Sequence, residues 1–361
     1  MNKKKIIIAT GGTGGHIFPA ISLAQYLYKK NFEVEITTDI RGKKFFNEIN
    51  FLEIKTISTA TIFIKNPILI LKNIFLIIFS IIKSILYLKK KKPHLVFGVG
   101  GYSSFPVCFA SKTLGIPLLI YENNLLLGKA NKILSFFAKK IFTSFSEVQG
   151  IDGNLKTKSL YCGNIIRQEI MNYKHNFNEK NDLKILVLGG SQAAKIFGEK
   201  LPRIFEMIKK ENLKISIYQQ CLPEQNNSLK NFYESISIQN EIFNFDPNIL
   251  KYYKKIDLVI TRSGSSVSAE LLNCNIPFIS VPLEKSADDH QNKNAEFFQK
   301  KGFCFLIKEN QIDESLFLLI KSFYKDKSIL KNCVNNQKSY SKINTMEKIL
   351  NEIENITDEK N

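Results

Sequence analysis

Short apolar runs recur along the chain, and each is followed by a small-residue turn and a segment with helical spacing. The runs at residues 5–10 (KIIIAT), 94–99 (HLVFGV), 183–188 (LKILVL) and 257–260 (DLVI) are rich in β-branched residues. Such runs are typical of strands buried in a parallel sheet. The pattern predicts an α/β fold of two Rossmann-like, doubly wound domains that face a cleft, each opened by a strand and a glycine turn.

The domain division is expected where the periodicity stops. Residues 172–182 are polar and lack apolar spacing, which indicates a linker. We therefore predict a first domain over 1–170, a linker over 171–182, a second domain over 183–340, and a terminal helix with a frayed tail over 341–361.

The first glycine turn, residues 11–15 (GGTGG), lies between a strand and a helix. Four glycines in five positions exceed what a tight turn needs, so a phosphate or pyrophosphate cradle is favoured over a simple βα turn. The spacing is neither the dinucleotide fingerprint nor a P-loop. His16 follows directly and is a candidate general base, although a helix-capping role is the alternative.

A second group of candidates lies within residues 257–295. The turn 262–266 (RSGSS) carries small side chains and opens a helix, so backbone N–H groups can face an anion. Glu270 lies in that helix, where a carboxylate suits a pair of sugar hydroxyls. Residues 288–291 (DDHQ) follow the next strand. An ordinary βαβ unit is the alternative, but the convergence of polar groups predicts a nucleotide-type ligand.

The most apolar region is 62–88. Pro67 interrupts it, Lys72 and Lys83 lie on a mostly polar helix face, and four lysines follow at 89–92. These features favour an amphipathic helix, either packed in the core or docked on an anionic leaflet, over a membrane span.

Composition narrows the classes of molecule that the protein is expected to bind. The formal net charge of +18 indicates an anionic partner, but no arginine-rich stripe favours nucleic acid. The six cysteines lack metal-type spacing and are typical of a reduced, cytosolic protein. The apolar run after the basic start is too short for a signal peptide.

Several motifs occur in a fixed order: GGTGGHIFPA, GVGGYSS, YENN, GNIIR, GGSQAA, RSGSSVSAE and DDHQNKNA. They resemble the MurG family, whose members convert lipid I to lipid II in peptidoglycan synthesis, and the resemblance covers residues 6–295. It implies a B-type glycosyltransferase fold with the donor in the C-terminal domain and the acceptor in the N-terminal one. No metal and no cofactor are expected.

The resemblance also implies roles for individual residues. It assigns substrate-binding roles to Thr13, Gly14, Gly15, Asn124, Arg167, Ser191, Asp246, Ser265, Ser266, Val267, Ser268, Ala269, Glu270 and Gln291. Glu270 is expected on the ribose hydroxyls, Ser191 at the donor pyrophosphate and Gln291 on the donor sugar. His16 is the first candidate for the general base and Glu122 the second.

Four positions depart from the family motifs. Ala193 replaces a glycine, Ile165 a proline, and Tyr121 and Asn123 replace histidine and glutamine. These departures change the shape of the chain beside the expected contacts.

The resemblance implies an inverting hexosyltransferase that moves GlcNAc from UDP-GlcNAc to the C4 hydroxyl of MurNAc in lipid I. The expected partners are UDP-GlcNAc, lipid I and an anionic membrane surface, with a peripheral location on the cytoplasmic face of the cell membrane. Two alternatives remain: an isomerase of the same architecture, such as a UDP-GlcNAc 2-epimerase, and a non-catalytic nucleotide-binding peripheral membrane protein.

Overall fold

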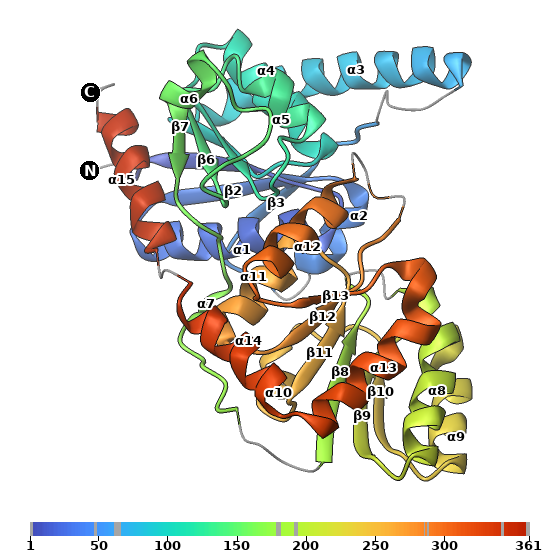
Figure 1. The fold of residues 1–361 in the computed structure, drawn as a ribbon. Coiled ribbons are helices and arrows are strands. Elements are labelled where there is room, and N and C mark those ends of the chain that lie inside the picture. Colours follow the sequence, from blue (N-terminus) through green and yellow to red (C-terminus); the bar gives the residue numbers. More distant parts are fainter. Residues whose placement is uncertain are drawn as a thin grey trace. The chain divides into compact units, whose positions relative to one another are not determined.

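The computed structural model describes residues 3–46, 49–60, 66–177, 182–190, 194–284, 286, 289–340 and 343–358. It divides into two compact units, Met1–Arg167 with Ile343–Asn361, and Gln168–Lys342 (Figure 1). Each unit is a parallel sheet covered by helices, which confirms the predicted fold class of two Rossmann-like domains.

Unit 1 contains a seven-stranded sheet in the order β3-β2-β1-β4-β5-β6-β7. Its strands are β1 (Lys5–Ala9), β2 (Glu33–Thr38), β3 (Glu53–Thr56), β4 (Leu95–Gly98), β5 (Leu118–Glu122), β6 (Lys140–Thr143) and β7 (Ser159–Tyr161). Its helices are α1 (Gly14–Lys29), α2 (Ile40–Lys43), η1 (Lys44–Phe46), α3 (Pro67–Lys91), η2 (Tyr102–Ser104), α4 (Phe105–Thr113), α5 (Lys129–Leu134), α6 (Asn154–Lys158) and α15 (Thr345–Asp358). The strand order reverses between β1 and β4, where open α/β sheets bind ligands.

Unit 2 contains a six-stranded sheet in the order β10-β9-β8-β11-β12-β13. Its strands are β8 (Asp182–Leu188), β9 (Lys214–Gln220), β10 (Gln239–Phe243), β11 (Leu258–Thr261), β12 (Phe278–Ser280) and β13 (Phe305–Leu306). Its helices are α7 (Gln168–Met171), α8 (Lys195–Lys210), η3 (Pro223–Gln225), α9 (Asn226–Ser235), α10 (Leu250–Tyr253), α11 (Ser265–Cys274), α12 (His290–Lys300), η5 (Glu309–Gln311), α13 (Ile312–Lys325) and α14 (Ser328–Lys338). Here the order reverses between β8 and β11.

Strand β1 shows why the apolar runs do not alternate with polar residues. Ile6 and Ile8 pack into a core cluster with residues of α1 and α15, on one face of the sheet. Ile7 and Ala9 pack into a second cluster with residues of α4. Because successive side chains point to opposite faces, a strand buried on both faces must be apolar at every position.

The unit boundaries differ from the predicted ones. Residues 168–175, which include part of the expected linker, pack on α11: Asn273 Nδ2 donates to the Ile170 carbonyl at 3.2 Å, and His175 N to the Cys274 carbonyl at 2.7 Å. The terminal segment is not an appendage, since α15 contributes to the core of unit 1. Thr345 Oγ1 donates to the Cys162 carbonyl at 2.8 Å.

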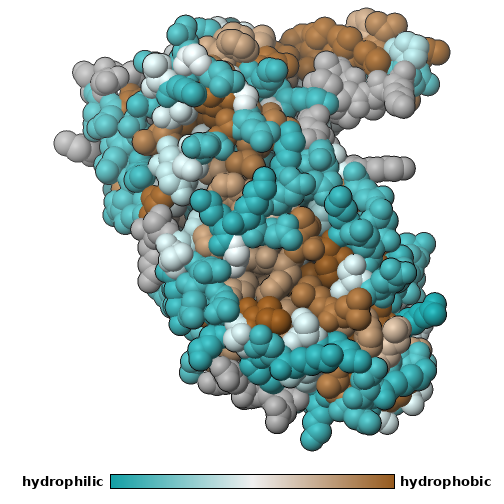
Figure 2. Space-filling view, viewed as in Figure 1, coloured by the Kyte–Doolittle hydropathy of each residue, from teal (hydrophilic) through white to brown (hydrophobic). Residues whose placement is uncertain are grey.

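Helix α3 packs on unit 1 only toward its C-terminal end. Ser80, Ser84 and Leu88 are buried, whereas its N-terminal half projects from the unit (Figure 1). Its surface is largely apolar (Figure 2). It is the one helix among the described residues that is long and apolar enough to cross a membrane. Only 11% of its most apolar 18-residue stretch is buried.

The carboxylate of Glu35, buried in β2, joins α3 to the sheet. It forms ion pairs with Lys91 of α3 at 2.8 Å and Lys5 of β1 at 3.5 Å, and the Tyr87 hydroxyl donates to it at 2.6 Å. Burial alone would raise the pKa of Glu35. Hydrogen bonds from Lys91 and Tyr87 outweigh burial and hold that pKa below its ordinary value.

This network gives a testable pH dependence. Because the folded pKa is lowered, ionised Glu35 stabilises unit 1 above its unfolded pKa, and the stabilisation is lost as the pH falls through the folded value. We expect Glu35→Gln to lower the urea midpoint at pH 7 and to flatten the loss of stability between about pH 5 and pH 3. Glu53→Gln, which changes the exposed partner of Lys91, is the matched control. An unchanged acid dependence in Glu35→Gln would contradict the assignment.

Candidate active site

The two glycine loops of unit 1 meet at the point where its strand order reverses. The first follows β1 and the second follows β4. A Cβ on Gly11 would lie 2.2 Å from the Ser103 Cβ, so the loops touch only because Gly11 lacks one. Gly12 has φ +87°. Helix α1 then begins at Gly14, and its N-terminus carries the positive end of the helix dipole.

His16 lies in the first turn of α1 and packs on the second glycine loop. A Cβ on Gly100 or Gly101 would lie 3.1 Å or 3.3 Å from its ring. His16 Nδ1 is 3.1 Å from the Val99 carbonyl oxygen. Because a carbonyl only accepts, Nδ1 carries the proton and Nε2 is the acceptor of the neutral ring. This tautomer is the one that a general base at Nε2 requires.

Glu122 ends β5 and is buried. Its Oε1 accepts from Asn124 N at 3.0 Å and Asn124 Nδ2 at 3.3 Å, and its Oε2 accepts from Gly128 N at 2.9 Å and Asn131 Nδ2 at 2.8 Å. Burial raises the pKa of Glu122, and these hydrogen bonds oppose the rise. A carboxylate has about four acceptor sites, so these four donors use its full capacity to accept hydrogen bonds. The contacts therefore favour a role in holding Asn124 over a role as base.

Arg167, at the end of unit 1, lies over the ring of Phe18 at 4.8 Å from the guanidinium carbon to the ring centroid. Phe18 belongs to α1, two residues after His16. The predicted residues Thr13, Gly14 and Gly15 begin the same helix, so Arg167 shares this end of unit 1 with them.

In unit 2, the predicted donor segment forms the start of α11. The residues Ser265, Ser266, Val267, Ser268, Ala269 and Glu270 all lie in this helix. Glu270 is 3% exposed. Ser263 Oγ lies 2.6 Å from Ser280 Oγ and joins the ends of β11 and β12. Arg262 NH1 donates to the carbonyls of Val281 and Pro282 at 3.3 and 3.2 Å and pairs with Glu309.

The other predicted residues of unit 2 follow different strands. Gln291 lies in α12, after β12, and its Oε1 accepts from Leu283 N at 3.0 Å. Asp246 follows β10 at the sheet edge, where Oδ1 accepts from Asn248 N at 2.8 Å. Ser191 lies outside the described residues. Among those described, no three His, Cys, Asp or Glu side chains gather so as to hold a metal ion.

Comparison with known proteins decides the family. The glycosyltransferase family 28 N-terminal domain matches residues 6–143, and its C-terminal domain matches residues 184–353. A UDP-N-acetylglucosamine–N-acetylmuramyl-(pentapeptide) pyrophosphoryl-undecaprenol N-acetylglucosamine transferase of Pelagibacter ubique is 37% identical over 317 residues, which is 87% of either chain. The chain belongs to the MurG family.

A second relative supports this MurG assignment, and two solved structures share the fold. A relative of the same name from Rickettsia felis is 35% identical, over 86% of this chain and 87% of the relative. The crystal structure of Acinetobacter baumannii MurG covers 98% of this chain and all of its own, with a TM-score of 0.78 at 23% identity. An S. aureus MnaA–UDP co-structure covers 97% and 96%, with a TM-score of 0.69 at 14% identity. These two structures show the fold alone.

The structure shows a hydrogen-bonded group of side chains around Asp39 that the sequence analysis did not predict. Asp39 follows β2, and its carboxylate accepts from Gly42 N at 2.8 Å, Ser103 Oγ at 2.7 Å, and Arg41 Nε and NH2 at 3.0 and 2.7 Å. A Cβ on Gly12 would lie 3.9 Å from Arg41 NH2. The signal was present in the sequence, as an aspartate at a strand end with an arginine two residues later.

Proposed function

We propose that this protein transfers N-acetylglucosamine from UDP-N-acetylglucosamine to the C4 hydroxyl of the N-acetylmuramyl unit of an undecaprenyl-pyrophosphoryl-linked pentapeptide acceptor, with inversion. The observation that carries the proposal is the 37% identity, over 87% of either chain, to a relative named for this reaction. Membership of glycosyltransferase family 28 supports the enzyme class, a hexosyltransferase acting in peptidoglycan synthesis.

We assign the donor to unit 2. Glu270 accepts hydrogen bonds from the ribose hydroxyls, and the N-terminus of α11, with Ser265 and Ser266, faces the diphosphate. Gln291 contacts the sugar, and the backbone at Asp246 contacts the uracil. As the bond from the anomeric carbon to the diphosphate oxygen breaks, UDP leaves with the electron pair, and helix N-termini stabilise the added charge.

We assign the acceptor to unit 1. His16 Nε2 takes the proton of the C4 hydroxyl while the hydroxyl oxygen forms its bond to the anomeric carbon. The acceptor diphosphate lies on the first glycine loop and the N-terminus of α1, within reach of the Arg41 guanidinium. Asp39 holds that guanidinium on one edge, and the Arg41 side chain is 62% exposed.

One assay tests the proposal against both alternatives. Radiolabelled UDP-GlcNAc is incubated with the protein, with and without a short-chain lipid I analogue. Label transfer to the analogue is expected, and no conversion without it. Conversion of UDP-GlcNAc alone would indicate an isomerase. UDP binding without product would indicate a binding protein.

We further propose that α3 docks this protein as a peripheral protein on the cytoplasmic face of the cell membrane. Its exposed apolar residues are Ile68, Leu69, Leu71, Ile74, Phe75, Leu76, Ile78, Phe79, Ile82 and Leu86. Lys72, Lys83 and Lys90 are spaced by near-whole helical turns and so follow one line of the helix. Such a face buries its apolar side chains among lipid chains while its lysines reach anionic headgroups.

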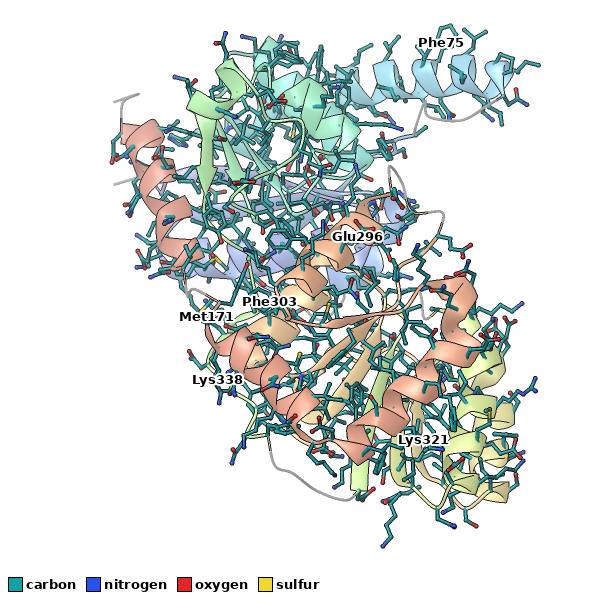
Figure 3. All side chains as sticks on the ribbon, viewed as in Figure 1. Phe75, Met171, Glu296, Phe303, Lys321 and Lys338 are labelled. Carbon is teal, nitrogen blue, oxygen red and sulfur yellow. The ribbon has the colours of Figure 1, made fainter. Side chains whose placement is uncertain are left out.

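Phe75 lies on the projecting part of α3 (Figure 3) and is 72% exposed. We expect Phe75→Asp with Phe79→Asp to weaken binding to anionic vesicles by about 100-fold or more, because each buried aromatic contributes about 1.5–3 kcal/mol. Vesicle co-sedimentation measures this. Leu318→Asp on α13, which replaces a residue 63% exposed in unit 2, is the matched control and should bind normally. Equal loss in both variants, or none in either, would refute docking through α3.

A further inference from the structure

The first turn of α1 contains a backbone carbonyl whose usual α-helical donor position is occupied by a proline. In an α-helix the carbonyl of Gly15 accepts from the N–H four residues later. That residue is Pro19, which lies inside α1 and has no N–H. The proline ring also crowds the carbonyl four residues before it. The Gly15 carbonyl therefore cannot form its regular hydrogen bond to the residue four positions later.

Asn123 provides a donor to this carbonyl. Its Nδ2 donates to the Gly15 carbonyl at 3.1 Å, and its side chain is buried, with 3% of the residue exposed. The Oδ1 of the same amide accepts from the Tyr121 hydroxyl at 3.1 Å and from Asn164 Nδ2 at 3.4 Å. The Gly15 carbonyl only accepts, and the Asn164 amide nitrogen only donates. If the Asn123 amide were flipped, its oxygen would face the Gly15 carbonyl oxygen and its nitrogen would face the Asn164 nitrogen, so both hydrogen bonds would be lost.

The Tyr121 hydroxyl is oriented in turn. It accepts from the backbone N–H of Ile165 at 3.1 Å, which directs its own proton toward Asn123 Oδ1, with the Gly163 carbonyl as a longer alternative at 3.4 Å. A proline at position 165 would have no N–H to give. Tyr121, Asn123 and Ile165, which looked like separate departures in the sequence, thus form one hydrogen-bonded group.

We propose that Asn123, oriented by Tyr121 and the Ile165 N–H, is a positioning residue for His16. His16 directly follows Gly15, so the Asn123 bond fixes the backbone that carries the imidazole. The Val99 carbonyl fixes the ring itself, at 3.1 Å from Nδ1. The catalytic part of this inference rests on the proposed function, in which His16 removes the acceptor proton.

Pro19 makes the inference testable by rescue. Asn123→Ala removes the side-chain amide that donates to the Gly15 carbonyl. We expect kcat to fall about 10- to 100-fold, with the KM for UDP-GlcNAc within about twofold of wild type, because a small misplacement of a catalytic group costs this much. Pro19→Ala restores an N–H four residues after Gly15. The double variant should recover kcat to within about threefold of wild type, and Pro19→Ala alone should have near-normal kcat.

An NMR readout separates this inference from the proposed function. The chain has four histidines, so ¹⁵N-histidine spectra can resolve the His16 ring. Asn123→Ala and Tyr121→Phe should both shift the His16 ring signals, and Pro19→Ala should reverse the shift in the Asn123→Ala protein. Unchanged ring signals in Asn123→Ala, or a loss of kcat that Pro19→Ala does not repair, would overturn the inference. An inactive wild-type protein that shows these shifts would instead refute the proposed function.

Discussion

Replacing His16 with alanine is expected to lower kcat about 1,000-fold, within the range that positioned general bases contribute. The hydrogen bond from Nδ1 to the Val99 carbonyl holds the ring in the tautomer whose Nε2 accepts a proton. Alanine removes that acceptor but leaves the glycine loops, so the fold and donor binding should persist. Steady-state kinetics with the lipid I analogue, together with a thermal melt, would measure both effects.

The matched control for His16 is His94. It lies just before β4, at the opposite end of this strand from the glycine loop, and its Nδ1 accepts from Lys5 N at 3.0 Å. His94→Ala should therefore keep near-normal kcat. Near-normal turnover in His16→Ala would remove His16 from the mechanism. Since the carboxylate oxygens of Glu122 accept from four donors, the base would then have to be sought outside the predicted pair.

The fold was largely predictable because its strands are buried on both faces. Ile6, Ile7 and Ile8 had to be apolar together, and this pattern identified the strand and the glycine loop after it. β6 and β7 are harder to predict from the sequence. Both strands are short. β7, with the sequence SLY, is only half-buried, so its sequence contains no long apolar run. Helix α15 was predicted, but its packing on unit 1 depends on contacts across most of the chain.

The residues of the candidate site could be predicted from the sequence better than the contacts between them. The glycine spacing pointed to His16, and the small-residue turn pointed to α11. The sequence did not reveal that Glu122 accepts four hydrogen bonds, because these come from the loop after β5 and from Asn131 of α5, whose positions depend on tertiary structure. Nor could it pair Pro19 with Asn123, since the donor lies more than a hundred residues away from the carbonyl it serves.

Replacing Glu270 is expected to damage donor binding more than any other single change in unit 2. A carboxylate that accepts from two ribose hydroxyls contributes about 1.5–3 kcal/mol for each hydrogen bond. We therefore expect Glu270→Ala to raise the KM for UDP-GlcNAc by about 100-fold or more. Glu270→Gln, which keeps the shape but loses the charge, should have a smaller effect. Glu234→Gln on α9, which pairs with Lys230, is the matched control and should change neither parameter.

A donor that lacks one ribose hydroxyl distinguishes a direct contact from a general loosening of α11. The wild-type protein should bind the 2′-deoxy or 3′-deoxy analogue of UDP-GlcNAc more weakly than the natural donor, and Glu270→Gln should lose most of that preference. Glu270 is 3% exposed, so its replacement can also affect folding. A thermal melt of each variant measures the effect on folding separately from the effect on donor binding. If Glu270→Gln discriminates between the two donors as strongly as wild type does, the carboxylate does not contact the ribose, and the assignment of the donor to α11 fails with it.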